Sequence, residues 1–290
     1  MSGLEHVNGH RPDGLLHMLH PLLKAAPRPD RDVFAFDLDL ALKSIVRLHA
    51  VVPDGAFTAA GLGTERQGSG VVIDNAGLVL TIGYLIVEAA QVTLGLHGGR
   101  KVSAQVIAYD HETGFGMVRA IEDLGLQPVT FGTSASVNAD DPVVVASFGG
   151  VGHSIGGQVV ARREFAGSWE YMLDDAIFTA PMHPYWGGAA LIDAKGRLVG
   201  TGSLYTEETA PDHGASPGNM FVPIDLLEPI YDDMLATGRA KRRSRPWLGM
   251  YTAEADGRLI VTGMAPRGPA AEAGIEPGDI VLSLQGVAVK

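Results

Sequence analysis

Residues 68–81 read Gly-Ser-Gly-Val-Val-Ile-Asp-Asn-Ala-Gly-Leu-Val-Leu-Thr, and this stretch decides the fold. Two short apolar runs, Gly70–Ile73 and Leu78–Ile82, lie on either side of the segment Asp74-Asn75-Ala76-Gly77. Asp, Asn and Gly are the residues that tight turns prefer, and runs of this length and composition favour strands. The stretch therefore predicts a β-hairpin.

Similar short apolar runs, separated by turn signals, follow along the chain. They are Val92–Leu96, Val102–Ile107, Met117–Ala120, Val129–Phe131, Pro142–Ser147, Gly157–Arg163, Ala176–Ala180, Ala190–Asp193, Leu198–Gly202 and Asn219–Pro223. Many short strands with few helices between them predict barrels or sandwiches. Two other segments differ: Leu40–Val52 begins as helix and ends as strand, and Asp225–Ala236 has apolar residues at helical spacing.

The composition limits the class of protein. Of the 290 residues, 46% are hydrophobic and 19% charged, which is typical of a globular chain. The net charge of -11 argues against nucleic acid as a partner. The absence of cysteine excludes disulfides and thiolate metal sites. No run approaches the roughly 20 apolar residues of a transmembrane helix. The N-terminus shows no secretory signal, so as it stands we expect a cytoplasmic chain.

The pattern of residues suggests four segments. Residues 1–37 are rich in His, Pro and Asp and predict a flexible arm, whereas residues 38–236 carry the predicted strands. Residues 237–246 are basic, and we interpret them as a solvated linker rather than a nucleic-acid patch because the rest of the chain is acidic. Residues 247–290 form a further small segment.

Three stretches together resemble the HtrA family, also called DegP-like, of trypsin-fold serine proteases with PDZ domains. The first is the hairpin at 68–81, which in the family leads into Thr-Asn-Asn-His-Val. The second is Thr113-Gly-Phe-Gly-Met-Val118, in place of Thr-Asp-Leu-Ala-Val-Leu. The third is Met182-His-Pro-Tyr-Trp-Gly-Gly-Ala-Ala-Leu191, in place of Asn-Pro-Gly-Asn-Ser-Gly-Gly-Pro-Leu.

The resemblance implies an all-β architecture. We expect a chymotrypsin-like, or trypsin-like, double β-barrel with barrels near residues 38–135 and 136–224. Pro269–Leu282 resembles the helix-turn-strand signature of a PDZ domain, and it lies within the last segment. Because the chain ends at Lys290, where the remaining elements of that module should begin, the expected PDZ-like domain is partial.

The three positions of the catalytic triad carry other residues. The resemblance puts Tyr84 in place of the histidine, Gly114 in place of the aspartate and Gly187 in place of the serine. A serine protease needs a nucleophilic hydroxyl, an imidazole base and a carboxylate that orients it. Glycine has no side chain, and tyrosine, with a pKa near 10, is a poor base at neutral pH. The resemblance therefore implies a pseudoprotease with no intact catalytic residue.

The turn that should form the oxyanion hole is also altered. Tyr185, Trp186 and Gly187 stand where the family has Gly-Asn-Ser, whose backbone N–H groups face the developing oxyanion. A bulky residue in place of a glycine indicates a different backbone. The two aromatic rings either form an apolar platform for a peptide or fill the cleft.

Other residues that could support chemistry have ordinary explanations. His111, His153 and His183 lack the spacing of a metal motif, so we expect no metal and no cofactor. Ser154 and Ser203 suit turns or strands. Asp174 and Asp175 suit a solvated turn.

In the last segment, Trp247-Leu248-Gly249-Met250 stands where the family has the loop that receives a peptide carboxylate. The function that the sequence predicts is therefore binding of protein or peptide ligands by an inactive homologue, as a chaperone-like or regulatory subunit. An active relative is one expected partner, and family analogy implies a homo-oligomer, specifically a trimer. An active endopeptidase with an atypical site and a purely structural scaffold are the alternatives.

Overall fold

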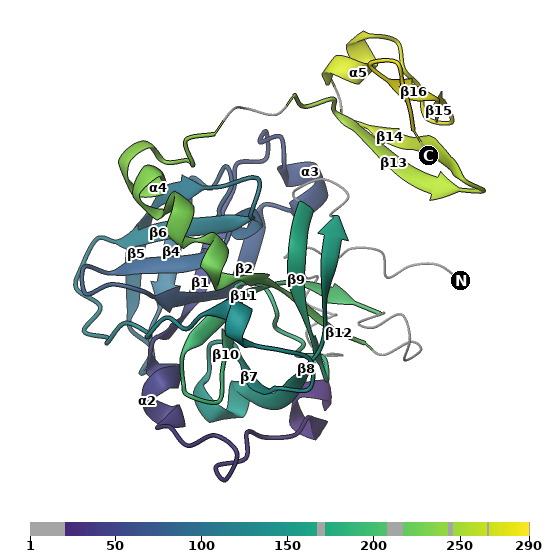
Figure 1. Ribbon diagram of the computed structural model, residues 1–290. Coiled ribbons are helices and arrows are strands. Elements are labelled where there is room, and N and C mark those ends of the chain that lie inside the picture. Colours follow the sequence, from purple (N-terminus) through teal and green to yellow (C-terminus); the bar gives the residue numbers. More distant parts are fainter. Residues whose placement is uncertain (1–20, 167–171, 208–216, 243–245, 266, 290) are drawn as a thin grey trace. The chain divides into compact units, whose positions relative to one another are not determined.

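The computed structural model describes residues 21–166, 172–207, 217–242, 246–265 and 267–289. Strands make up most of its regular structure (Figure 1). The contacts divide the chain into two compact units, the first ending at Lys241 and the second running from Arg242 to the end of the chain. The first unit contains two closed six-stranded barrels. This is the all-β, trypsin-like double-barrel fold that the resemblance predicts.

The first barrel has the strand order β1-β2-β3-β6-β5-β4, and all its neighbouring strands pair antiparallel. Its strands are β1 Ile45–Val51, β2 Glu65–Val72, β3 Leu78–Ile82, β4 Gln91–Gly95, β5 Lys101–Tyr109 and β6 Phe115–Ala120. The predicted hairpin is β2 and β3, with Val71 opposite Leu80. Asp74 shapes its turn by accepting hydrogen bonds from the N–H groups of Ala76 and Leu78.

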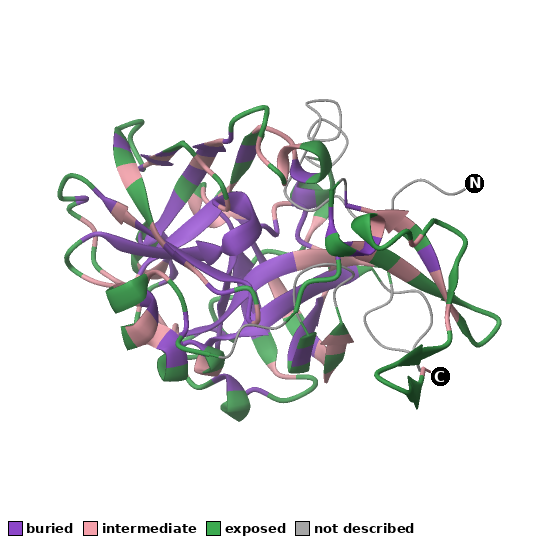
Figure 2. Cartoon of the chain, turned by 90° about the horizontal axis from the view of Figure 1, so that it is seen from above, coloured by how far each residue is buried: buried purple, intermediate pink, exposed green. Residues whose placement is uncertain are grey.

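The second barrel has the order β10-β11-β12-β9-β8-β7. Its strands are β7 Pro142–Ala146, β8 Ser154–Ala166, β9 Met172–Ala180, β10 Ala190–Ile192, β11 Leu198–Thr206 and β12 Gly218–Pro223. Closing each sheet on itself pairs the edge strands and gives each barrel its own apolar interior. Figure 2 shows the buried residues concentrated in the strands of the barrels.

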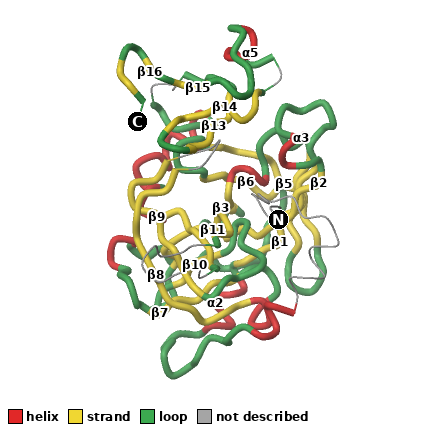
Figure 3. Tube along the Cα trace, turned by 90° about the vertical axis from the view of Figure 1, so that its right-hand side faces the viewer, coloured by secondary structure: helices red, strands yellow, loops and turns green. Residues whose placement is uncertain are grey.

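Short helices connect and flank the barrels, as Figure 3 shows. Helix α2, Leu38–Lys43, begins after Asp37, whose carboxylate accepts a hydrogen bond from the Leu40 N–H, and β1 follows it directly. Helix α3, Ala59–Leu62, lies between β1 and β2, and helix α4, Tyr231–Thr237, follows the second barrel.

Two predicted elements differ from the structure. The helix predicted over Asp225–Ala236 is broken into the 3-10 turns Ile224–Leu226 and Glu228–Ile230, and only then α4. Pro229 explains the break, because it lacks a backbone N–H and is tolerated only near the start of a helix. Val129–Phe131 forms no strand: Val129 donates to Val72, and Phe131 makes an isolated bridge to Leu198.

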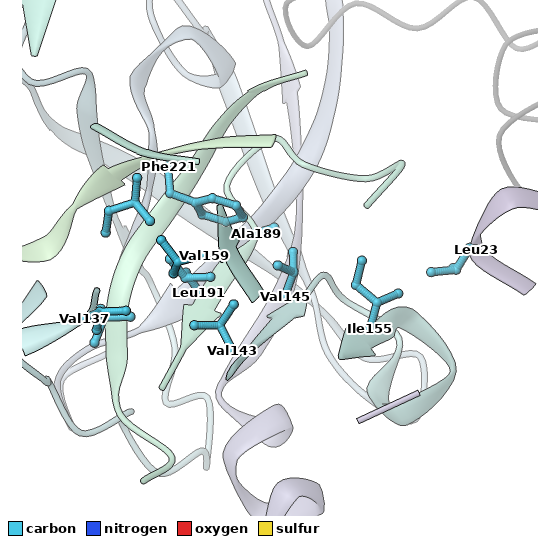
Figure 4. Close-up of a cluster of buried hydrophobic side chains, with 11 residues drawn as sticks. Leu23, Val137, Val143, Val145, Ile155, Val159, Ala189, Leu191 and Phe221 are labelled. Carbon is cyan, nitrogen blue, oxygen red and sulfur yellow. The ribbon is translucent and has the colours of Figure 1, made fainter. Parts of the chain in front are cut away.

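Residues 21–37, which the sequence assigns to a flexible arm, lie against the second barrel. Leu23 is 1% exposed and joins the apolar cluster of that barrel (Figure 4). The Gly156 N–H donates to the Pro27 carbonyl, and the Arg28 guanidinium donates to the carbonyls of Gly152 and Ser154. These contacts give residues 21–37 a packed position, and residues 1–20 of the expected arm lie outside the described part.

The second unit has a three-stranded sheet and a short hairpin. Its elements are β13 Met250–Ala255, β14 Arg258–Met264, α5 Pro269–Glu272, β15 Ile280–Val281, β16 Ser283–Leu284 and β17 Val287–Ala288. Strand β14 lies between β13 and β15. The helix-turn-strand pattern expected for residues 269–282 is therefore present as α5 followed by β15.

Candidate functional site

Tyr84 lies in the 3-10 turn Gly83–Leu85, directly after β3, and is 1% exposed. Its hydroxyl donates a 2.7 Å hydrogen bond to the carbonyl of Ser203 on β11, so it joins the first barrel to the second. A Cβ atom placed on Gly187 would lie 3.0 Å from the Tyr84 Oη. The structure thus brings Tyr84 and Gly187 together, with the tyrosine hydroxyl beside the space of the missing side chain.

Gly114 lies in the turn between β5 and β6. Its carbonyl accepts a 2.7 Å hydrogen bond from the N–H of Gly83, the residue before Tyr84. The three positions that the resemblance assigns to the triad, Tyr84, Gly114 and Gly187, therefore lie close to one another between the barrels. Gly114 has a φ of 80°, in the left-handed region that favours glycine. The backbone at the aspartate position thus suits a residue without a side chain.

Asp110, which the sequence analysis did not single out, lies in the same β5–β6 turn as Gly114. It is 6% exposed, and its Oδ2 accepts hydrogen bonds from both the N–H and the hydroxyl of Thr113. The Gly114 N–H in turn donates to the Asp110 carbonyl. Asp110 therefore holds the β5–β6 turn in shape, and the Asp-x-x-Thr spacing is the signal that could have revealed it.

Arg66 holds the Tyr84 turn through hydrogen bonds of its guanidinium. The sequence analysis did not single out this residue either. It is fully buried, and its guanidinium donates to the carbonyls of Gly63, Tyr84 and Val87 and to the Thr58 hydroxyl. A buried guanidinium is costly unless its donors are satisfied. Because three of these acceptors are backbone carbonyls, no pattern of side chains in the sequence could have indicated the site.

The turn Tyr185–Gly187 is held by hydrogen bonds within the protein. The Tyr185 N–H, which the resemblance assigns as an oxyanion-hole donor, donates a 3.0 Å hydrogen bond to Nδ1 of His183. The Gly187 carbonyl accepts a 2.8 Å bond from the Ser69 N–H, and the Gly188 N–H donates to the Gly202 carbonyl. The first potential oxyanion donor is therefore already used by a neighbouring side chain.

The two aromatic residues of this turn fill space. Trp186 is 5% exposed, and its ring centroid lies 5.8 Å from that of Tyr205. Tyr185 is half-buried, with ring centroids of His153 at 5.4 Å and His183 at 6.1 Å. Burial raises the pKa of Tyr205, and the nearby Glu207 raises it further, so this hydroxyl stays protonated at neutral pH. The packing favours a filled cleft over an open aromatic platform.

An apolar groove of about 870 Å³ lies on the second barrel, next to this turn. One side is formed by the N-terminal segment and the other by β8, Pro181 and Met182, with Tyr205 linking the groove to Trp186. It is lined by Leu22, Ala25, Ala26, Pro27, Gly156, Gly157, Gln158, Ala180, Pro181, Met182, Tyr205 and Pro217. The groove presents mostly apolar atoms and several backbone groups to a ligand.

The remaining candidates have structural partners. The ring of His111 lies 4.2 Å from that of Tyr109, and Asp175 forms an ion pair with Arg162. The Ser154 hydroxyl donates to the Val151 carbonyl. Across the described ranges, no three His, Asp or Glu side chains are grouped so as to hold a metal ion.

In the second unit, the segment Trp247–Met250 precedes and begins β13. Trp247 and Leu248 are 54% and 43% exposed. The Leu248 carbonyl accepts from the Ala270 N–H, and the Gly249 carbonyl accepts from the Ala265 N–H. Gly249 has a φ of 69°, which turns the chain tightly against Gly268. The carbonyls thus hold the loop in place while its aromatic and apolar side chains remain exposed.

With this geometry described, comparisons with known proteins define the class. A trypsin-like peptidase domain model matches residues 68–200, and a PDZ domain model matches residues 260–290. The fold is also that of the solved HtrA-type protease AlgW with tripeptide, with a TM-score of 0.56, 22% identity, and coverage of 90% of this chain and 84% of that one. The chain is thus a trypsin-like peptidase domain followed by PDZ-domain sequence.

Two relatives define the family more narrowly. Serine endoprotease DegS of Haemophilus influenzae is 25% identical over 281 residues, covering 91% of this chain and 81% of the relative. Periplasmic serine endoprotease DegP of Salmonella typhimurium is 26% identical over 234 residues, covering 76% of this chain and 48% of the relative. The chain is thus a homologue of HtrA-family serine proteases, and it spans about half the length of DegP.

The comparisons and the structure also bear on location. The DegP relative is named as periplasmic, so the comparisons give no support to the expectation of a cytoplasmic chain. Among the helices that the structure describes, none is long and apolar enough to span a membrane.

Proposed function

We propose that this HtrA-like chain is a pseudoprotease that acts by binding protein or peptide segments, as a chaperone-like or regulatory subunit. The observation that carries the proposal is the proximity of Tyr84, Gly114 and Gly187, the three residues that the resemblance assigns to the triad. Two of these residues have no side chain. The third, Tyr84, is buried with its hydroxyl directed to the Ser203 carbonyl.

The chemistry of acyl transfer supports this proposal. Covalent catalysis needs a nucleophile, a base that takes its proton and a group that orients the base. The Tyr84 hydroxyl acts here as a donor to a carbonyl, which is the opposite of accepting a proton from a nucleophile. The Tyr185 N–H is also engaged by His183, so stabilisation of an oxyanion would first require this bond to break.

Binding is supported by surfaces outside the filled cleft. The apolar groove on the second barrel offers an extended, mostly apolar segment a site of suitable size. The exposed side chains of Trp247 and Leu248 lie in the segment that the resemblance assigns to peptide binding. Assembly as a homo-oligomer, and association with an active relative, are parts of the same proposal that rest on the HtrA-like relatives.

The direct test incubates the purified protein with casein and, separately, with a serine-reactive phosphonate. We expect neither cleavage nor labelling. Labelling of a serine, or cleavage that persists through purification, would instead establish the alternative of an endopeptidase with an atypical site. Fluorescence anisotropy with a library of extended peptides tests binding, and the absence of saturable binding would favour a purely structural scaffold.

A second test restores the triad residues with Tyr84→His, Gly114→Asp and Gly187→Ser together. We expect no proteolysis of casein, because residue 114 would need a φ of 80° and the Tyr185 N–H would still be bound by His183. Circular dichroism of the triple variant establishes that it is folded. Robust proteolysis would show that the turn and the backbone at residue 114 remain competent.

A further inference from the structure

His183 is a fully buried histidine whose backbone and ring are both fixed. The Asn219 side chain holds the backbone from β12: its Oδ1 accepts the His183 N–H at 2.6 Å, and its Nδ2 donates to the His183 carbonyl at 3.2 Å. The ring lies between two backbone groups, the Tyr185 N–H and the His153 carbonyl. His183 therefore joins three segments of the second barrel at the degenerate turn.

The two hydrogen bonds of the ring define its tautomer. A backbone N–H only donates, so Nδ1 of His183 must accept from Tyr185, at 3.0 Å. A carbonyl only accepts, so Nε2 must carry the proton that it shares with the His153 carbonyl, also at 3.0 Å. This network assigns the neutral Nε2–H form and leaves no room for a proton on Nδ1.

We propose that His183 is an acid-sensitive latch that holds the Tyr185–Gly187 turn closed. A proton on Nδ1 would face the Tyr185 N–H, so two donors would oppose each other where one hydrogen bond now exists. The new charge would also lie in a fully buried position, where desolvation opposes ionisation. The closed turn thus binds fewer protons than an open one, and lowering the pH favours opening.

The surrounding contacts define which residues move. Asn219 anchors the His183 backbone on one side, while Ser69 and Gly202 anchor Gly187 and Gly188 on the other. The segment between these anchors carries Tyr185 and Trp186. Opening therefore exposes two aromatic side chains beside the apolar groove and releases the Tyr185 N–H. This consequence deepens the proposed binding function, whereas the latch itself is independent of it.

Titratable and charged groups among the described residues adjoin this cluster. Tyr185 belongs to the turn itself, and His153 belongs to the 3-10 turn Gly150–His153 that supplies the carbonyl. Arg28, from the N-terminal segment, donates to the carbonyls on either side of His153. His153 is thus the neighbour whose own protonation could imitate the effect, and the experiment has to separate the two rings.

The test follows Trp186 fluorescence as the pH falls from about 8 to 5, the range in which histidine takes up a proton. We expect a red shift of the emission maximum that is absent from Trp186→Phe. His183→Asn keeps an acceptor near the Nδ1 position but cannot be protonated, so its emission should stay constant. His153→Asn is the matched control and should keep the wild-type red shift. A shift that persists in His183→Asn, or disappears in His153→Asn, overturns the proposal.

Nitrogen-15 NMR of the wild-type imidazoles decides the question without any variant that must fold. At pH 8 we expect His183 to carry its proton on Nε2, with Nδ1 as an acceptor. On acidification, uptake of a proton at Nδ1 should coincide with the change in Trp186 emission. Protonation of the His183 ring without a change in Trp186, or an Nδ1–H form at pH 8, contradicts the latch. Because neither measurement uses a substrate, failure of the latch leaves the test with casein unaffected.

Discussion

Two tryptophans lie in loops that the resemblance aligns with the catalytic turn and the peptide-binding loop of the family, yet their environments differ. Trp186, in the turn of the barrel cleft, is 5% exposed and stacks near Tyr205, whereas Trp247, in the loop before β13, is 54% exposed. A residue at a family's binding position can therefore have become part of the interior. The comparison teaches that the barrel cleft is closed by its own side chains, while the loop of the second unit keeps an apolar surface for contact.

The largest effect should come from truncating these two tryptophans. Trp186→Ala should lower the free energy of unfolding by about 3–5 kcal/mol, because it leaves a cavity beside Tyr205 in the first unit. Trp247→Ala should change it by no more than about 0.5 kcal/mol, because the side chain is mostly exposed. Chemical denaturation, monitored by circular dichroism, measures the change in unfolding free energy for each variant. Equal losses of stability would remove the distinction between the two loops.

Two glycines sharpen the same comparison at the level of the backbone. Gly188 and Gly274 have φ values of 70° and 81°, but a Cβ on Gly188 would lie 1.9 Å from the Ser69 carbonyl oxygen, whereas one on Gly274 meets nothing within 4 Å. Gly274→Ala should cost about 1–2 kcal/mol, the strain of a left-handed residue. Gly188→Ala should carry the same backbone strain and, in addition, a destabilisation of about 1–3 kcal/mol from overpacking against the Ser69 carbonyl. The difference between the two midpoints of denaturation therefore isolates crowding at the cleft.

Arg66 and Arg258 provide a third contrast. Arg66 is fully buried and satisfies three carbonyls around the Tyr84 turn, whereas Arg258 is exposed on β14. Arg66→Met should cost about 1–3 kcal/mol, because it leaves buried carbonyls without their donor and water replaces the guanidinium only in part. Arg258→Met should fall within about 0.5 kcal/mol. Similar stabilities for the two variants would show that the Tyr84 turn does not depend on Arg66.

These contrasts also show which features the sequence could predict. Apolar runs separated by turn residues depend on local chemistry, so the hairpin is predicted and β3 has its predicted bounds, although β2 begins at Glu65, before the predicted run Gly70–Ile73. The resemblance supplied the double barrel, whereas its assignment of Tyr84, Gly114 and Gly187 to the triad stays a prediction. The roles of Arg66 and His183 depend on backbone groups of Tyr84, Val87, His153 and Tyr185, which only the fold brings near. A sequence pattern carries no record of such contacts, so it could not reveal them.

Two predictions that the structure contradicts failed for the same reason, namely contacts and constraints that composition and spacing do not show. The apolar spacing over Asp225–Ala236 suited a helix, but Pro229 limited α4 to its second half. The composition of the N-terminal region suggested a flexible arm, yet Leu23 fills a place in the core of the second barrel. One buried leucine, together with backbone and guanidinium hydrogen bonds to β8 and its preceding turn, is enough to fix such a segment, and composition does not reveal it.

The smallest expected effect concerns Glu88, at the edge of the Tyr84 turn. Partial burial raises the pKa of this carboxyl, but hydrogen bonds from the Thr58 hydroxyl, the Thr58 N–H and the Phe57 N–H, together with the Arg66 charge, lower it more, to below its ordinary value of about 4.5. The folded state therefore favours the ionised form. Its contribution to stability is present above the ordinary pKa and is lost as the pH falls through the lowered value.

Denaturation midpoints measured between about pH 6 and pH 3 test this contribution. Glu88→Gln should destabilise the protein at pH 6 by a small amount, because the carboxyl is largely exposed and solvent screens its charge. The difference from wild type should shrink toward pH 3, where the wild-type carboxyl is itself protonated. Glu254→Gln, on exposed β13 of the second unit, is the matched control. A difference for Glu88→Gln that stays constant with pH would mean that Glu88 supports the turn through shape and neutral hydrogen bonds rather than through its charge.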